Sequence, residues 1–171
     1  MKQLFIIVAF FATAGFLLAD TEEKAGAEVW FFVATDCPIA NHYAPEINRI
    51  FTEYSERGIS FSLIYPDAAL TKDEVAEHRR EYALKVDGRV DLDHAFVEKA
   101  GVTTTPEVAV FDREGSLIYR GMIDDLFSEF GDRRRVASKR YLRDVLDQYL
   151  ADKSVQFTET DPVGCLIESI K

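Results

Sequence analysis

The feature that most constrains the fold is the stretch from Val29 to Ile47, where an apolar run meets a cysteine and then a helical pattern. Residues 29–34 form a short apolar run of β-branched and aromatic residues, which is typical of a buried strand. After Thr35 and Asp36, Cys37-Pro38 opens a segment with apolar residues at mostly three- and four-residue steps. This spacing predicts a helix over residues 39–57, with a kink at Pro45 inside it.

The position of Cys37 at the start of this helix indicates thiol chemistry. Unpaired backbone N–H groups and the helix dipole favour a thiolate there, and the thiolate is the form that attacks disulfides and peroxides. Asp36 opposes ionisation because it places a negative charge beside the thiol. A buried and inert cysteine explains the position about equally well, since free cysteines are among the most buried residues.

Residues 1–19 have the pattern of a secretory signal peptide. Lys2 gives a positive start, residues 4–19 are almost wholly apolar, and acidic residues begin at Asp20. We expect cleavage after Ala19, then a short linker over residues 20–27, and a periplasmic or secreted protein. An uncleaved anchor is the alternative, although the apolar stretch is a little short to cross a membrane.

Charge and cysteine content exclude several classes of protein. The chain has 30 acidic and 20 basic residues, so its net charge of −10 repels nucleic acid and anionic lipid. We therefore expect no nucleic-acid partner, and membrane contact only through an uncleaved signal. The basic cluster of residues 133–135, with Lys139 and Arg140, is offset by nearby acids and is expected to be a solvated surface. The 2 cysteines, Cys37 and Cys165, do not resemble a disulfide-rich scaffold.

The remaining patterns predict one α/β domain over residues 28–152, followed by a tail of residues 153–171 that carries Cys165. Thr71 begins a capping-box pattern, Asp93 is the expected cap of a short helix that ends at Gly101, and residues 113–115 form the expected turn of a hairpin. The expected strands are residues 29–34, 59–65, 107–112 and 116–120; the expected helices are residues 39–57, 71–83, 94–100 and 138–151.

This order of elements, with Cys37 at a strand-to-helix turn and Thr103-Thr-Thr-Pro106 before a strand, resembles the thioredoxin-like superfamily. The phrases Thr35-Asp-Cys-Pro-Ile39, Tyr43-Ala-Pro-Glu46 and Thr105-Pro-Glu-Val-Ala-Val110 resemble secreted redoxin domains of the alkyl hydroperoxide reductase/thiol-specific antioxidant type. The resemblance implies a thioredoxin-like fold, with a central mixed sheet and helices on both faces. It also implies a cis peptide bond before Pro106, beside a catalytic Cys37.

The resemblance further implies a substrate groove formed by Thr105, Pro106, Pro38 and Glu107, where the backbone could pair with an extended partner segment. Glu107 has two interpretations: it points near the thiol and influences substrate choice, or it lies on the surface at a strand edge.

The chain departs from the family pattern at the motif itself. Ala40 stands where the second cysteine of C-x-x-C would be, so a dithiol cycle cannot run within Cys37-Pro38-Ile39-Ala40. Phe31 stands where thioredoxins carry a buried acid. The peroxiredoxin pattern Pro-x-x-x-Thr-x-x-Cys fails at Trp30 and Ala34, so classical peroxidase activity is not expected.

Cys165 is the candidate for the missing partner. Pro162 and Gly164 predict a loop that could fold back, so Cys165 could resolve a mixed disulfide formed by Cys37. A static disulfide and two unpaired thiols are the alternatives, and the separation of the two cysteines decides among them.

A metal site is not expected. His42 is five residues from Cys37 and so lies on another helix face, while His78 and His94 are most simply surface residues. Soft thiolates could still recruit Cu(I). No cofactor is expected.

The function that these patterns favour is a thiol-disulfide oxidoreductase with Cys37 as the nucleophile and Cys165 as a possible resolving thiol. Its expected partners are proteins with thiols or disulfides, or a redox partner protein. The alternatives are a peroxiredoxin-like, peroxide-reducing antioxidant enzyme, and a non-catalytic thioredoxin-like module that binds a partner or copper.

Overall fold

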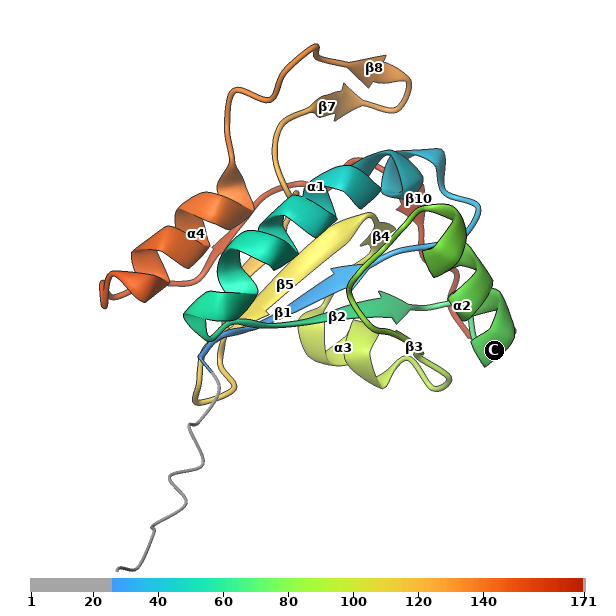
Figure 1. The fold of residues 1–171 in the computed structure, drawn as a ribbon, viewed down its shortest axis with the longest axis horizontal. Helices are drawn as coiled ribbons and strands as arrows, with labels where there is room; N and C mark the ends of the chain where they lie inside the picture. Colours follow the sequence, from blue (N-terminus) through green and yellow to red (C-terminus); the bar gives the residue numbers. More distant parts are fainter. Residues whose placement is uncertain (1–25, 171) are drawn as a thin grey trace, which may run out of the picture.

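The computed structural model describes residues 26–170, so the predicted signal peptide lies outside the described residues. A six-stranded mixed sheet with the order β3-β2-β1-β5-β6-β9 forms the centre of the fold (Figure 1). β1 pairs in parallel with β2 and antiparallel with β5, so the strand that leads to Cys37 lies inside the sheet. The strands of this sheet are β1 (Glu28–Phe32), β2 (Ser60–Tyr65), β3 (Gly88–Val90), β5 (Glu107–Phe111), β6 (Leu117–Gly121) and β9 (Thr158–Glu159).

Two further strand pairs and the helices surround this sheet. The short pairs are β4 (Thr104–Thr105) with β10 (Cys165–Leu166), and β7 (Phe127–Glu129) with β8 (Asp132–Arg133). The helices are α1 (Pro38–Tyr54), continued by the 3₁₀ turn η1 (Ser55–Arg57), then α2 (Lys72–Glu81), α3 (Ala95–Ala100) and α4 (Tyr141–Leu150). None of the helices in the described part of the chain is long and apolar enough to cross a membrane.

The apolar side chains of β1 alternate between two cores, one on each face of the sheet. Val29 and Phe31 pack in the core that α1, α2 and α4 cover. Trp30 and Phe32 point to the opposite face, where they pack with residues of α3 and β5. Both faces of β1 are therefore buried, which explains why its sequence is a continuous apolar run.

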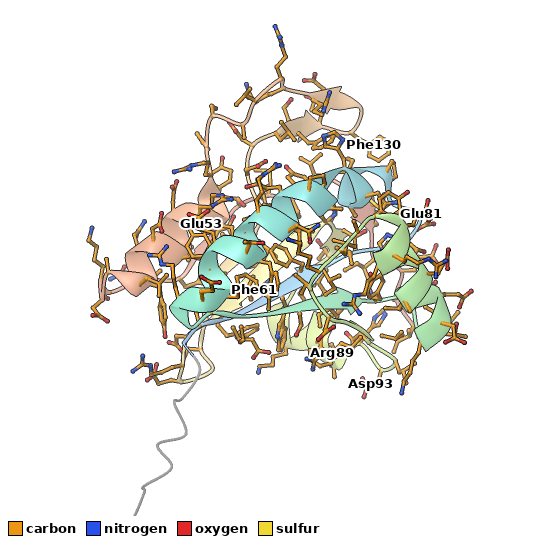
Figure 2. The ribbon with its side chains drawn as sticks, viewed as in Figure 1. Glu53, Phe61, Glu81, Arg89, Asp93 and Phe130 are labelled. Atoms are coloured by element: carbon orange, nitrogen blue, oxygen red, sulfur yellow. The ribbon has the colours of Figure 1, made fainter. Side chains whose placement is uncertain are left out.

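Helices α1 and α4 lie side by side over one face of the sheet (Figure 1). Arg143 of α4 donates to Glu46 of α1 at 2.9 Å and also pairs with Glu53, which Figure 2 labels. These bonds, together with the buried Leu142 and Leu146, fix α4 against α1.

Most predicted elements are present within one or two residues of their expected ends. The capping box is formed: the Thr71 side chain accepts from the Glu74 N–H, and the Glu74 carboxylate accepts from the Thr71 N–H. The Thr105-Pro106 peptide bond is cis, as the resemblance implied. The hairpin between β5 and β6 also forms as predicted.

The predicted cap of α3 is wrong. The residue at the helix start is His94, which has left-handed backbone geometry, and the helix is capped mainly by Asp91. The Asp91 carboxylate accepts from the N–H groups of Phe96 and Val97 at 3.2 and 2.9 Å. Asp93 accepts only from the N–H of Ala95.

Residues 153–170 follow α4 and run back across the molecule (Figure 1). Their first strand, β9, joins the main sheet in parallel with β6. Their second, β10, reaches β4.

Candidate functional site

Cys37 lies at the point where β1 gives way to α1. It is the N-cap residue of α1, with extended backbone geometry and Pro38 at the first helical position. Proline is favoured there because it has no N–H to leave unpaired and its φ angle already suits a helix. The Cys37 side chain is only 1% exposed, and its sulfur donates to the Thr105 carbonyl at 3.1 Å. The thiol is thus held against the strand that precedes Pro106.

Cys165 reaches the same place through backbone pairing. β10 is antiparallel to β4, with Cys165 opposite Thr105 and Leu166 opposite Thr104. The N–H of Ile167 extends this pairing by donating to the Thr103 carbonyl at 2.9 Å. A Cβ atom at Gly164 would collide with the Thr105 carbonyl, so the close approach of the two strands requires glycine at that position.

The two sulfur atoms lie 2.7 Å apart, and both cysteines are free thiols. The Cys165 thiol donates to the Cys37 sulfur. Burial, the hydrogen bond to Cys37 and the charge that Cys37 carries once it is ionised raise the pKa of Cys165 to about 12. Cys165 therefore keeps its proton at neutral pH, and Cys37 is the sulfur that receives a hydrogen bond. The two thiols thus differ in protonation, as a nucleophile and a second, protonated thiol must.

The four residues assigned to a substrate groove occupy different environments. Thr105 and Pro106 are buried, with Thr105 in contact with both cysteines, whereas Pro38 is exposed. Glu107 is 2% exposed, so the surface role considered for it is wrong. Its carboxylate accepts from the N–H groups of Thr103 and Thr104 at 2.9 and 3.2 Å. Glu107 thus holds β4 from the interior of the fold.

The environment of Glu107 also affects its ionisation. Burial raises the pKa of its carboxyl group above the usual range, while the two N–H bonds act in the opposite direction. A buried carboxylate at this position has a cost that its hydrogen bonds only partly offset.

A cavity of about 430 Å³ opens beside the two thiols. Its wall includes Asp36, Pro66, His94, Thr105 and Cys165. A small molecule in this cavity would touch Cys165, while Cys37 lies behind it. The site therefore has room for a small oxidant or reductant next to the cysteine pair.

Two histidines predicted to lie at the surface are buried, so that prediction is wrong. The His78 ring bonds with the Tyr65 hydroxyl at 2.9 Å and the Asn41 side chain at 2.8 Å. The His94 ring bonds with the Pro66 carbonyl at 2.7 Å. Both rings are used within the fold, and burial lowers the pKa of His78. Within residues 26–170 no group of three metal-binding side chains is close enough to hold an ion.

The sequence predicts site residues Cys37, Cys165, Thr105 and Pro106, and these four lie together in the structure. Sequence reasoning missed Asn41, which links α1 to His78, and it missed the reason for Gly164. Gly164 directly before Cys165 could have indicated that another backbone lies close to this position.

Comparison with known proteins gives a consistent family and fold. The Redoxin family model matches residues 16–131, which is more than half of the chain. No curated protein matches. A hypothetical protein from Sinorhizobium meliloti has a TM-score of 0.73 at 21% identity, over 85% of this chain and 80% of that one.

Two other solved structures extend the comparison. An uncharacterized conserved protein from Geobacillus kaustophilus has a TM-score of 0.71 at 22% identity, over 85% of this chain and 78% of that one. A putative thiol:disulfide interchange protein DsbE from Chlorobium tepidum has a TM-score of 0.53 at 16% identity, over 76% of this chain and 82% of that one. The fold is thioredoxin-like. Together with the extent of the family match, the site and fold show that this chain belongs to the Redoxin family.

Proposed function

We propose that this protein is an exported thiol-disulfide oxidoreductase in which Cys37 attacks the substrate and Cys165 resolves the intermediate. The observation that carries the proposal is the 2.7 Å contact of the two sulfur atoms, held by the pairing of β10 with β4. Membership of the Redoxin family supports it. The apolar start of the sequence supports export to an oxidising compartment.

The proposed reaction has two exchange steps. In the first, the Cys37 thiolate attacks a substrate disulfide, forms a mixed disulfide and releases one substrate thiolate. In the second, Cys165 loses its proton and attacks the Cys37 sulfur, which forms the Cys37–Cys165 disulfide and releases the second substrate thiolate. The substrate gains two electrons, the cysteine pair loses two, and the released thiolates take up protons. The same pair runs in reverse to oxidise substrate thiols.

The site supports different roles for its two cysteines. The motif has Ala40 where a resolving cysteine would be. Cys165 supplies a second thiol beside Cys37 instead. The Thr105 carbonyl accepts from the Cys37 thiol and so orients the sulfur. The raised pKa of Cys165 keeps this thiol protonated until a mixed disulfide forms.

The test is thiol trapping with mass spectrometry on the mature protein, equilibrated through a series of glutathione redox potentials. We expect a Cys37–Cys165 disulfide that forms and breaks above about −300 mV. With a disulfide substrate, Cys165→Ser should accumulate a mixed disulfide at Cys37, and Cys37→Ser should accumulate none. A bond that survives at lower potentials would make the pair structural, and two free thiols at every potential would exclude the cycle.

Peroxide reduction is a second candidate, favoured by the burial of Cys37 and the cavity beside the pair. In that reaction the Cys37 thiolate attacks the peroxide, becomes a sulfenic acid and releases an alcohol or water. Cys165 then condenses with the sulfenic acid, which forms the same disulfide and releases water. Trapping of a sulfenic acid in Cys165→Ser after treatment with hydrogen peroxide, at a rate above that of free cysteine, would favour this candidate.

A further inference from the structure

A second cavity, of about 590 Å³, lies between α1 and the segment that connects β6 to α4. Helix α1 contributes Asn41, His42 and Arg49, and the segment contributes Arg133, Arg135 and Arg140. In Figure 1 this segment, with the β7–β8 hairpin, extends above the N-terminal half of α1. The cavity is thus formed by the basic cluster that sequence analysis placed on a solvated surface.

Of the four arginines that line this cavity, only Arg49 is paired with one of its acids, Glu46. Its two carboxylates are bonded inward: Glu46 accepts from Arg143 and Arg49, and Asp124 accepts from the Tyr43 hydroxyl at 2.6 Å. Among the described residues, no carboxylate lies within 4.0 Å of the guanidinium groups of three arginines. Those three are Arg133, Arg135 and Arg140.

A buried carboxylate within the arginine-bearing segment joins its two ends. Asp125 accepts from the N–H groups of Ser138 and Lys139 at 2.6 and 2.8 Å, and from the Ser138 hydroxyl. Arg133 is also tied to α1, because it donates to the ring of His42 at 2.8 Å. These bonds hold the positive charges over α1. In a chain of net charge −10, such a cavity is a local site for an anion.

The cavity lies close to Cys37 along α1. The N–H of Asn41 donates to the Cys37 carbonyl, so the cavity begins one helical turn from the thiol. A neighbouring hollow, lined by Thr35, Asp36 and Pro38, shares Asn41, His42 and Tyr82 with it. A chain that reaches the rim of the thiol site can therefore extend into the arginine-lined cavity.

Two exposed apolar side chains belong to the segment that carries the arginines. Val136 lines the cavity and is 77% exposed, and Phe130 lies at the tip of the β7–β8 hairpin, where it is 67% exposed (Figure 2). Arginine beside exposed apolar side chains is typical of surfaces that bind protein segments.

We propose that this cavity binds an acidic segment of a protein partner. Carboxylates of that segment pair with Arg133, Arg135 and Arg140, since the planar guanidinium group matches a carboxylate in geometry. If the protein exchanges thiols and disulfides as proposed above, its substrates are proteins that carry acidic residues next to a reactive cysteine or disulfide.

The test measures binding without thiol chemistry. Fluorescence anisotropy follows a labelled, cysteine-free peptide rich in glutamate and phenylalanine, titrated with Cys37→Ser protein. The matched peptide has glutamine in place of every glutamate. We expect the glutamate peptide to bind at least about tenfold more tightly, with affinity that falls as salt rises.

The decisive variant is Arg133→Gln/Arg135→Gln/Arg140→Gln. Its matched control is Arg113→Gln, which removes an exposed arginine from the β5–β6 hairpin, away from this cavity. We expect the triple variant to lose the preference for the glutamate peptide and the control to keep it. Equal binding of the two peptides, or equal loss in both variants, would overturn the proposal.

Two further arms separate other anions from the peptide. Full displacement of the peptide by inorganic phosphate at an equal concentration would assign the cavity to a small anion and overturn the proposal. Binding to phosphatidylserine vesicles provides the second arm. If the triple variant loses vesicle binding but still binds the peptide, the proposal is also overturned. Because binding is measured in Cys37→Ser, a failure of the thiol exchange in the wild-type protein would contradict the proposed function and leave this result intact.

Discussion

At the scale of single residues, the site depends on which of its two thiols keeps its proton. Cys165 donates to Cys37, and burial together with the charge of Cys37 raises the pKa of Cys165 to about 12. Only the thiolate attacks, so Cys165 should be unreactive until Cys37 has entered a disulfide. This order prevents Cys165 from competing for the substrate.

The first prediction concerns the reactivity of Cys165 in the variant Cys37→Ser. Removing Cys37 leaves the burial of Cys165 but removes the hydrogen bond and the negative charge that raise its pKa. A lower pKa gives a larger thiolate fraction at any pH below it, so iodoacetamide should modify Cys165 faster at pH 8 than in the wild-type protein. Site-resolved mass spectrometry across a pH series measures this, and an unchanged pH dependence would contradict the coupling.

The second prediction concerns Glu107, which holds Thr103 and Thr104 from inside the fold. Glu107→Ala leaves the buried N–H of Thr104 and the part-buried N–H of Thr103 without an acceptor, so we expect it to lower the free energy of unfolding by about 2 kcal/mol at pH 7. Glu107→Gln keeps an acceptor oxygen and should cost less. Urea unfolding of both variants measures the difference.

The pH dependence of Glu107 checks the same contact. Because its pKa in the folded protein is raised, its contribution to stability is present below the unfolded pKa of about 4.3 and is lost as pH rises through the folded value. The Gln variant lacks this titration. The free energy of unfolding of Glu107→Gln, taken relative to the wild type, should therefore be higher at pH 7 than at pH 4. The reverse trend would contradict a raised pKa for Glu107.

At the scale of elements, the site is assembled by three short pieces of backbone. The end of β1 and the start of α1 provide Cys37, β4 provides the Thr105 carbonyl, and β10 provides Cys165. β10 covers the edge of β4 that precedes Pro106. An extended partner segment can pair with that edge only after β10 leaves it.

The third prediction uses Gly164 to displace β10. Gly164→Val adds a side chain where the Thr105 carbonyl lies, so β10 should separate from β4 while both cysteines remain. We expect slower formation of the Cys37–Cys165 disulfide and faster alkylation of Cys37. Leu166→Ala is the matched control, because Leu166 is 81% exposed. Equal rates of disulfide formation in Gly164→Val and the wild type would show that the pairing of these strands does not position Cys165.

These elements also show what sequence can and cannot predict. The strand before Cys37 is a continuous apolar run and the helix after it is long and periodic, and the predicted ends of both differ from the observed ones by only a few residues. β4 and β10 have two residues each, too few for any periodicity, and their pairing joins positions about 60 residues apart. His78 is buried because Tyr65 and Asn41, distant in sequence, bond both of its nitrogens.

At the scale of the whole molecule, most of the 30 acidic residues are spread over the surface, and a few bind the fold together. Asp125 is the one that fixes the segment carrying the arginine cavity. Burial tends to raise its pKa, but the Ser138 hydroxyl, the N–H groups of Lys139 and Ser138, and Arg134 together lower the pKa of Asp125 to about 2. Neighbouring Asp124 differs, because burial raises its pKa although the hydrogen bond from Tyr43 acts in the opposite direction.

The last prediction follows from this depressed pKa. A carboxyl group whose pKa is lowered by folding contributes stability above its unfolded pKa of about 3.9, and loses it as pH falls toward the folded value. Asp125→Asn should therefore lower the free energy of unfolding by about 1–2 kcal/mol at pH 7, since the amide forms fewer and weaker bonds. The difference from the wild type should shrink between pH 4 and about pH 2.

Glu114→Gln, on the exposed β5–β6 turn, removes a comparable charge without these contacts and should change stability little at any pH. A difference for Asp125→Asn that stays constant down to pH 2 would mean that its carboxylate is not what holds the arginine-bearing segment. If the Asp125 carboxylate does hold this segment, Asp125→Asn should also weaken binding of the acidic peptide at pH 7, where Asp125 and the peptide glutamates are ionised.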